Sequence, residues 1–114
     1  MKVLVIGAGN MGLTYATAIA RSGVLKKEDL MIYDKSVEVI DRLSKDKENY
    51  ITHDTLGDAL PIADIIMLAV KPYHNDDLMS QMKDLMNDQQ LVISIMAGVT
   101  IETMQEGLGI RKVV

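Results

Sequence analysis

Three glycines near the start of the chain stand at a spacing that serves phosphate chemistry. Gly7, Gly9 and Gly12 form a G-x-G-x-x-G pattern directly after the apolar run Val3 to Ile6. In this pattern the first glycine permits a tight turn, the second removes a side chain that would block a pyrophosphate, and the third lets a helix pack closely on the strand. Backbone N–H groups and the positive end of the helix then face the phosphates. We therefore expect the whole loop to hold a dinucleotide: Gly7, Ala8, Gly9, Asn10, Met11 and Gly12.

A carboxylate follows the second apolar run at the distance that a dinucleotide site needs. Asp34 ends the run Leu30 to Tyr33, 22 positions after Gly12. An acidic residue about 20 residues beyond the glycines accepts hydrogen bonds from the hydroxyls of an adenosine ribose. Two plainer interpretations stay open. The glycines form only a tight strand-to-helix turn, or Asp34 only caps its own loop.

Strands and helices that alternate along the chain must position these residues. Short apolar runs predict strands, and apolar residues at helical spacing predict helices between them. The expected strands are Val3–Ile6, Leu30–Tyr33, Tyr50–Thr52, Ile65–Val70 and Leu91–Ile95, with the start of another at Arg111–Val114. The expected helices are Asn10–Ser22, Val37–Leu43, one that begins at 75–77 and one that begins after Thr100. This order predicts an α/β fold: a Rossmann-type doubly wound, mainly parallel sheet of five to six strands with helices on both faces.

Two further loops are expected at the same edge of the sheet. In a doubly wound sheet, ligands lie beyond the carboxyl ends of the strands, where the winding reverses beside the first strand. Ala69, Val70, Lys71 and Pro72 end the strand expected there, and the segment Ser94–Gly98 ends its neighbour. We expect both loops to face the dinucleotide. For Lys71, a cofactor contact or a solvent-exposed position is a better interpretation than a catalytic role.

The composition describes one domain and excludes several classes of protein. The chain has 114 residues, of which 48% are apolar and 25% charged, so we expect residues 1–114 to form a single NAD(P)-binding domain. A net charge of −4 without a basic cluster argues against a nucleic-acid partner, and no apolar run approaches the roughly 20 residues of a membrane span. The chain lacks Cys, and His53 and His74 stand alone in polar loops, so we expect no metal site. The totals favour a soluble cytoplasmic protein.

Three motifs together resemble the N-terminal domain of pyrroline-5-carboxylate reductase. They are Gly7-Ala8-Gly9-Asn10-Met11-Gly12, Ala69-Val70-Lys71-Pro72 and Ser94-Ile95-Met96-Ala97-Gly98-Val99-Thr100. They stand in the order and at the separations of that family, and the resemblance covers the whole chain.

The resemblance implies a reaction and a role for each motif. Members of this family reduce 1-pyrroline-5-carboxylate to L-proline in proline biosynthesis, by hydride transfer from NADPH or NADH. By resemblance, Gly7–Gly12 hold the pyrophosphate and position 34 lies at the adenosine ribose. Ala69–Pro72 run under the ribose and nicotinamide, and Ala97 and Gly98 approach the nicotinamide end.

The sequence departs from the family at its end. After a segment like Arg111–Val114, the family continues into an Arg-x-Met-Pro-Asn-Thr-Pro motif and a helical domain that forms the dimer and carries most of the substrate site. That domain is absent here, so we expect an excised or truncated cofactor domain that is inactive alone. We therefore nominate no catalytic residue, and we expect a homo-oligomer only with the missing domain.

The second departure is Asp34, where many members of the family have a small or neutral residue. Its carboxylate repels a 2′-phosphate, which favours NAD over NADP, whereas the neighbouring Lys35 and Ser36 are able to hold such a phosphate. We expect NADP or NAD as the cofactor, with Asp34 tilting the choice towards NAD.

Two other functions stay open. An NAD(H)-sensing module binds the cofactor and regulates a partner without hydride transfer. Another Rossmann dehydrogenase, such as one that acts on hydroxyacids, shares this domain and differs in its second domain. The segments Val70-Lys71-Pro72 and Ala97-Gly98-Val99-Thr100 favour the reductase, because a sensor does not need them.

Overall fold

The chain folds around one parallel sheet. The computed structural model describes residues 1–45, 50–70, 75–95, 101–108 and 113–114. Five strands are present in these residues: β1 (Val3–Ile6), β2 (Leu30–Tyr33), β3 (Ile51–His53), β4 (Ile65–Leu68) and β5 (Leu91–Ser94). Their order is β3-β2-β1-β4-β5, and each of these neighbouring pairs is parallel. The winding therefore reverses beside β1, which confirms the predicted doubly wound α/β fold.

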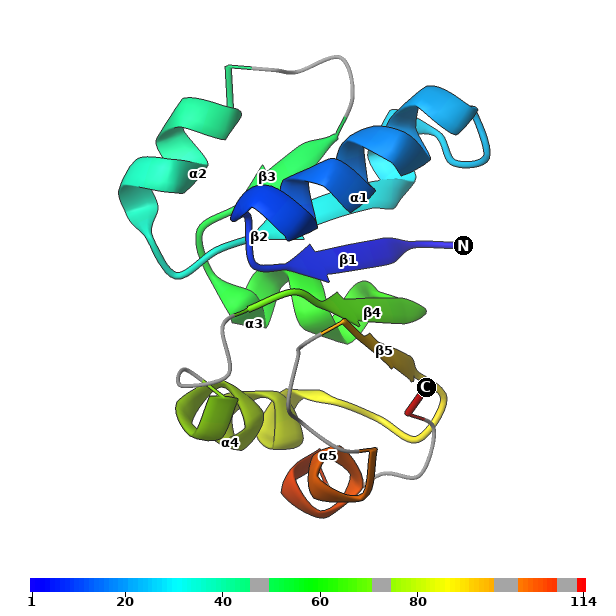
Figure 1. Cartoon of the computed structure of the whole chain (residues 1–114), viewed down its shortest axis with the longest axis vertical. Helices are drawn as coiled ribbons and strands as arrows, with labels where there is room; N and C mark the ends of the chain where they lie inside the picture. The colour runs from blue at the N-terminus through cyan, green and yellow to red at the C-terminus, as the bar shows by residue number, and fades with distance from the viewer. Residues whose placement is uncertain (46–49, 71–74, 96–100, 109–112) are drawn as a thin grey trace.

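Helices cover both faces of the sheet. The α-helices are α1 (Asn10–Ser22), α2 (Val37–Leu43), α3 (Leu56–Ala59), α4 (Asn75–Leu85) and α5 (Ile101–Leu108). Two short 3₁₀ segments, Lys27–Asp29 and Leu60–Ile62, precede β2 and β4. Figure 1 shows α1 and α2 on one side of the sheet and α4 and α5 on the other. Both faces are covered, as parallel strands require.

Strand β1 contributes to both cores because successive side chains of a strand point to opposite faces. Val3 and Val5 belong to the apolar cluster beneath α1 and α2. Leu4 and Ile6 belong to the cluster with α3, α4 and α5. This central position fixes the loop after Ile6 between two packed layers.

The two helices nearest the predicted site begin and end where the sequence favours it. Helix α1 ends at Gly23, whose φ of 73° is left-handed and whose N–H donates to the carbonyl of Ala20 at 3.4 Å. Helix α2 begins after Ser36, whose hydroxyl accepts a hydrogen bond from the N–H of Val39 at 3.4 Å. Both boundaries thus fall at residues whose types favour them.

The observed elements differ from the expected ones in detail. Strand β3 lies one residue later than expected, and β4 and β5 end earlier, at Leu68 and Ser94. Helix α3 was not expected. An additional strand is expected at Arg111–Val114. Among the described residues of that segment, Val113 forms a parallel bridge with Val92 of β5.

A buried glutamine joins two segments at the amino ends of β4 and β5, the edge of the sheet opposite the glycine loop. Gln90 is 2% exposed. Its Nε2 donates to the carbonyls of Leu60 at 2.7 Å and Ala63 at 2.8 Å, and its Oε1 accepts from the N–H of Asn87 at 3.0 Å. The side chain therefore joins the segment that enters β4 to the turn that enters β5.

No helix in the described part of the chain combines the length and apolar character needed for a membrane span.

Candidate dinucleotide-binding site

The loop after β1 requires glycine at its first position. Gly7 has a φ of +101°, a conformation that residues with a side chain rarely adopt. A Cβ there would also lie 2.8 Å from the carbonyl carbon and oxygen of Ala69. The N–H of Gly7 donates to the carbonyl of Tyr33 at 2.8 Å, and the N–H of Ala69 donates to that of Ile6 at 2.9 Å. The carboxyl ends of β1, β2 and β4 are thus joined at one point.

The third glycine lets α1 pack against this loop. A Cβ on Gly12 would lie 1.8 Å from the carbonyl oxygen of Gly7 and 3.2 Å from the Cβ of Ala69. A side chain at position 12 would therefore push the helix away from the sheet. This is the packing role that the sequence predicts for the third glycine.

The second glycine differs from the other two, because it faces open space. Gly9 has φ −72° and ψ −170°, and a Cβ built on it meets nothing within 4 Å. Its carbonyl accepts the first hydrogen bond of α1, from the N–H of Leu13 at 2.9 Å. The first N–H groups of a helix have no partner within the helix, and the first turn of α1 has no acidic residue. The start of α1 therefore provides donors and a positive field for an anion.

Asp34 joins the glycine loop to the loop after β2. Its Oδ2 accepts a hydrogen bond from the N–H of Ala8 at 2.8 Å, and its Oδ1 accepts one from the N–H of Ser36 at 2.8 Å. This is the loop-capping role left open by the sequence. It does not exclude the ribose role, since each carboxylate oxygen has a second lone pair and Asp34 lines a cavity.

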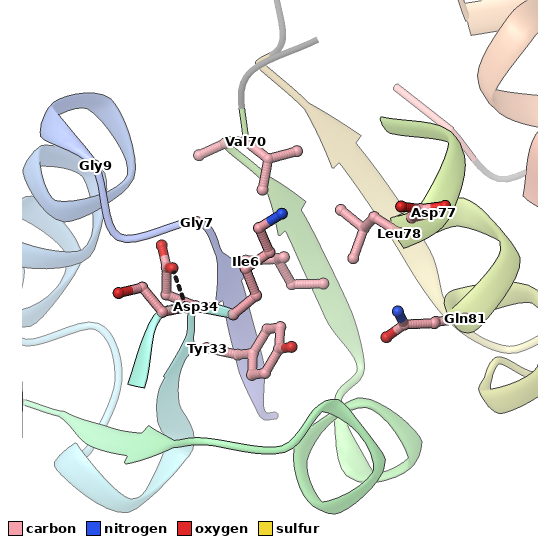
Figure 2. Close-up of a pocket in the computed structure, with 12 residues that line it drawn as sticks. Ile6, Gly7, Gly9, Tyr33, Asp34, Val70, Asp77, Leu78 and Gln81 are labelled. Atoms are coloured by element: carbon pink, nitrogen blue, oxygen red, sulfur yellow. Dashed lines mark hydrogen bonds between the residues drawn. The ribbon is translucent and has the colours of Figure 1, made fainter. Parts of the chain in front are cut away.

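A cavity of about 450 Å³ lies at the carboxyl edge of the sheet, at the position where the winding reverses. Its volume is within the roughly 300–1,000 Å³ typical of small-molecule sites. Figure 2 shows Tyr33 and Asp34 on one side of it and residues of α4 on the other, with Ile6 between them. The lining residues described are Ile6, Gly7, Gly9, Tyr33, Asp34, Lys35, Ser36, Ala69, Val70, Asp77, Leu78 and Gln81.

The structure brings most of the predicted contact residues together, although their contact with a cofactor stays a prediction. Seven of them line the cavity: Gly7, Gly9, Asp34, Lys35, Ser36, Ala69 and Val70. Ala8 and Gly12 are buried within the loop, where they support its shape. The backbone of Asn10 and Met11 forms the first turn of α1. Lys71, Pro72, Ala97 and Gly98 lie outside the described residues.

One wall of the cavity was not predicted as part of the site. Asp77, Leu78 and Gln81, here named the α4 wall, line it from the first turns of α4. From the sequence, Asp77 is expected only at the start of a helix. A signal was nevertheless present, because a helix that follows the strand beside β1 begins at the ligand-binding edge.

Tyr33 lines the same cavity with a largely buried ring. Burial raises the pKa of its phenol above the ordinary value of 10.0, and the negative charge of Asp34 raises this pKa further. The hydroxyl is therefore a neutral hydrogen-bonding group at physiological pH.

No group of three or more His, Cys, Asp or Glu residues suited to a metal ion occurs among the residues that the structure describes. The site instead offers backbone donors at Gly9 and a carboxylate at Asp34, a set that fits a diphosphate joined to a ribose.

Known proteins are similar to this chain in both sequence and fold. The pyrroline-5-carboxylate reductase of Staphylococcus saprophyticus is 34% identical over 110 residues, which cover 95% of this chain and 40% of that protein. The solved structure of a pyrroline-5-carboxylate reductase from Coxiella burnetii matches with a TM-score of 0.85 at 27% identity, over 95% of this chain and 40% of that one. The Plasmodium falciparum pyrroline carboxylate reductase, solved with NADP bound, matches with a TM-score of 0.79 at 28% identity, over 95% of this chain and 38% of that one.

These matches confirm the resemblance to pyrroline-5-carboxylate reductases. The chain spans about two fifths of the length of these relatives. A family model described as "NADP oxidoreductase coenzyme F420-dependent" matches residues 2–98. Since this match covers most of the sequence, the chain belongs to that family of oxidoreductases.

Proposed function

We propose that this chain is the cofactor-binding domain of an enzyme that reduces 1-pyrroline-5-carboxylate to L-proline with NAD(P)H. The observation that carries the proposal is the cavity bounded by Gly9 and Asp34, in a chain whose relatives are pyrroline-5-carboxylate reductases. The cofactor would supply a hydride from its nicotinamide to the imine carbon of the substrate ring. The described residues would bind and orient that cofactor, and none of them is assigned a catalytic role.

Each part of the site has a distinct binding role in this proposal. The backbone at Gly9 and the start of α1 hold the pyrophosphate, and Asp34 accepts hydrogen bonds from the adenosine ribose. Ala69 and Val70, at the end of β4, direct the nicotinamide half towards the neighbouring loop. The proposal also includes Lys71, Pro72, Ala97 and Gly98 as contacts of the ribose and nicotinamide.

The cofactor is NADP or NAD, and we propose a preference for NAD. Asp34 supports this preference because its carboxylate is fixed in the cavity wall by two backbone hydrogen bonds and cannot turn away from a 2′-phosphate without breaking them. Lys35 also lines the cavity, so the opposing cation limits the preference to a moderate one.

The proposed whole enzyme acts on a small substrate, assembles as a homo-oligomer through a second domain, and is cytoplasmic. The support for the location is a sequence without cysteine. Residues 1–114 form one domain in this proposal.

A chimaeric enzyme tests the proposed reaction. Residues 1–114 would be joined to the remainder of the Aquifex aeolicus pyrroline-5-carboxylate reductase, which is 31% identical to the chain. We expect the chimaera to oxidise NADH only when 1-pyrroline-5-carboxylate is added, and the 114-residue chain to bind NADH without turnover. A chimaera that binds NADH but leaves the substrate unreduced would favour the sensing module instead.

A further inference from the structure

The first two N–H groups of the glycine loop are bonded to the end of β2 and to the residue after it. The N–H of Gly7 donates to the carbonyl of Tyr33 at 2.8 Å, and the N–H of Ala8 donates to Oδ2 of Asp34 at 2.8 Å. Gly9 is the first loop residue whose N–H donates to no group among the residues described. An anion above Gly9 therefore meets N–H groups from Gly9 onwards, and the two earlier peptides serve to orient them.

Asp34 is the side chain that holds this part of the loop. Its other oxygen, Oδ1, accepts from the N–H of Ser36 at 2.8 Å, so the carboxylate is itself held in one orientation. In Figure 2 the Asp34 side chain points towards the loop between Gly7 and Gly9. Ala8 stands between these two glycines, whose backbones have wide conformational freedom. The bond from Ala8 to Asp34 therefore fixes a peptide that the glycines alone would leave free to turn.

We propose that Asp34 is a positioning residue for the pyrophosphate: by fixing the peptide between Gly7 and Ala8, it strengthens the binding of an anion that its own charge repels. The proposal rests on the proposed cofactor site and gives the carboxylate a role that does not depend on the ribose. A loop already held in its binding conformation binds more tightly, because it does not have to be ordered when the ligand arrives. The negative charge of Asp34 acts in the opposite direction.

These two effects predict changes of opposite sign when Asp34 is replaced. Charge alone predicts that a neutral residue at position 34 strengthens the binding of an anion. Positioning predicts weaker binding, by an amount that increases with the number of hydrogen bonds lost. Asp34→Asn keeps an oxygen that accepts from one of the two N–H groups, whereas Asp34→Ala keeps none.

Titration with inorganic pyrophosphate tests the proposal, because this anion has no ribose to contact Asp34. The unmodified chain, Asp34→Asn and Asp34→Ala would each be titrated while NMR spectra follow the backbone amide signal of Gly9. We expect the affinity for pyrophosphate to fall about threefold in Asp34→Asn and about tenfold in Asp34→Ala. The amide hydrogen of Ala8 should also exchange with solvent faster in Asp34→Ala than in the unmodified chain.

Two further variants separate positioning from charge and from stability. Glu38→Gln removes a negative charge from the first turn of α2, where Glu38 is exposed and is not among the cavity-lining residues described. Gln90→Leu removes buried hydrogen bonds at the opposite edge of the sheet, so it lowers stability without altering the loop. Both variants, when folded, should bind pyrophosphate within about twofold of the unmodified chain.

The possible failures are distinguishable. A chain that binds neither pyrophosphate nor NADH would overturn the proposed function, and this inference with it. If the chain binds NADH, the proposed function stands, and any of three results would overturn the positioning role. They are pyrophosphate binding by Asp34→Ala at least as tight as by the unmodified chain, an equal loss in Gln90→Leu, and no response of Gly9 to pyrophosphate. Circular dichroism spectra of the variants establish that each is folded.

Discussion

At the scale of single residues, the three loop glycines serve three separable purposes. Glycine is needed at position 7 because φ is positive there, and at position 12 because a side chain would clash with the carbonyl of Gly7. Neither constraint applies at Gly9. The open side of Gly9 is where the proposed pyrophosphate lies. Substitution at this position therefore separates binding from folding.

Gly9→Ala should keep the fold and lose the cofactor. The new methyl group meets no protein atom within 4 Å, so the free energy of unfolding should fall by less than about 1 kcal/mol, the usual effect of alanine at a helix N-cap. The methyl group occupies the space proposed for the pyrophosphate, so the affinity for NADH should fall about tenfold or more. Urea unfolding and calorimetric titration measure the two effects.

Gly12→Ala is the control with the opposite profile. Its methyl group would overlap the carbonyl oxygen of Gly7, so we expect a loss of at least about 2 kcal/mol in the free energy of unfolding. If Gly9→Ala bound NADH as tightly as the unmodified chain, the pyrophosphate would not lie over Gly9.

Asp34 should decide between the two cofactors. Asp34→Ser removes the charge that repels a 2′-phosphate. The ratio of the NADH affinity to the NADPH affinity, which we expect to exceed one in the unmodified chain, should therefore move towards one. Asp34→Asn is the matched variant: it also removes the charge but keeps a side-chain oxygen for one of the two backbone N–H groups. Tighter binding of NADPH than of NADH to the unmodified chain would contradict the proposed preference.

Tyr33 should make the chain less stable in alkali. Its pKa in the folded chain is raised above 10.0, first by burial and then by Asp34, so the neutral phenol is favoured in the folded state. This contribution to stability is complete below pH 10.0 and is lost as the pH rises through the raised pKa. As the pH rises through the raised pKa, the free energy of unfolding of the unmodified chain should therefore fall relative to that of Tyr33→Phe. A difference that does not depend on pH would show that Tyr33 titrates normally.

Residue types predicted the loops of the site but not the α4 wall. The loop from Gly7 to Gly12 and the carboxylate at Asp34 belong to a local pattern that is visible in sequence. Asp77 and Gln81 line the cavity because α4 packs on the sheet, in the same apolar cluster as Ile6. This packing has no local sequence signature, and only the order of strands and helices indicates it.

At the scale of elements, segments with clear ends were predicted most accurately. The residues that follow β1, α1 and β2 are Gly7, Gly23 and Asp34, so a residue that favours a turn marks each boundary. Helix α3 has only one turn, Leu56–Ala59, which is too short to show helical periodicity. The fold depends on the long, regular elements and was therefore predictable without it.

The buried Gln90 should hold two elements together without affecting the site. Gln90→Leu leaves the carbonyls of Leu60 and Ala63 without this donor, so the free energy of unfolding should fall by about 2–3 kcal/mol. NADH affinity should be unchanged in the folded variant, because Gln90 precedes β5 at the edge of the sheet opposite the cavity. Urea unfolding and NADH titration measure both quantities.

Gln89→Leu provides the matched control for this prediction. Gln89 is exposed and its backbone N–H, rather than its side chain, donates to Asn87, so its replacement should change stability by less than about 0.5 kcal/mol. Equal effects of the two substitutions would show that the buried hydrogen bonds of Gln90 add nothing to stability.

At the scale of the whole molecule, the fold gathers at one edge of the sheet what the sequence separates. The glycine loop, Asp34 and α4 are distant along the chain, and they meet because β1 lies between β2 and β4 with all three strands parallel. This arrangement would let 114 residues bind the proposed dinucleotide, whereas the proposed reaction requires the further length of the relatives.

The most direct test of the account is a crystal structure of the chain in complex with NADH. The account predicts pyrophosphate oxygens about 3 Å from backbone nitrogens at the start of α1, above Gly9, with ribose hydroxyls donating to Asp34. A dinucleotide bound elsewhere, or a cavity without nucleotide at saturating NADH, would contradict it.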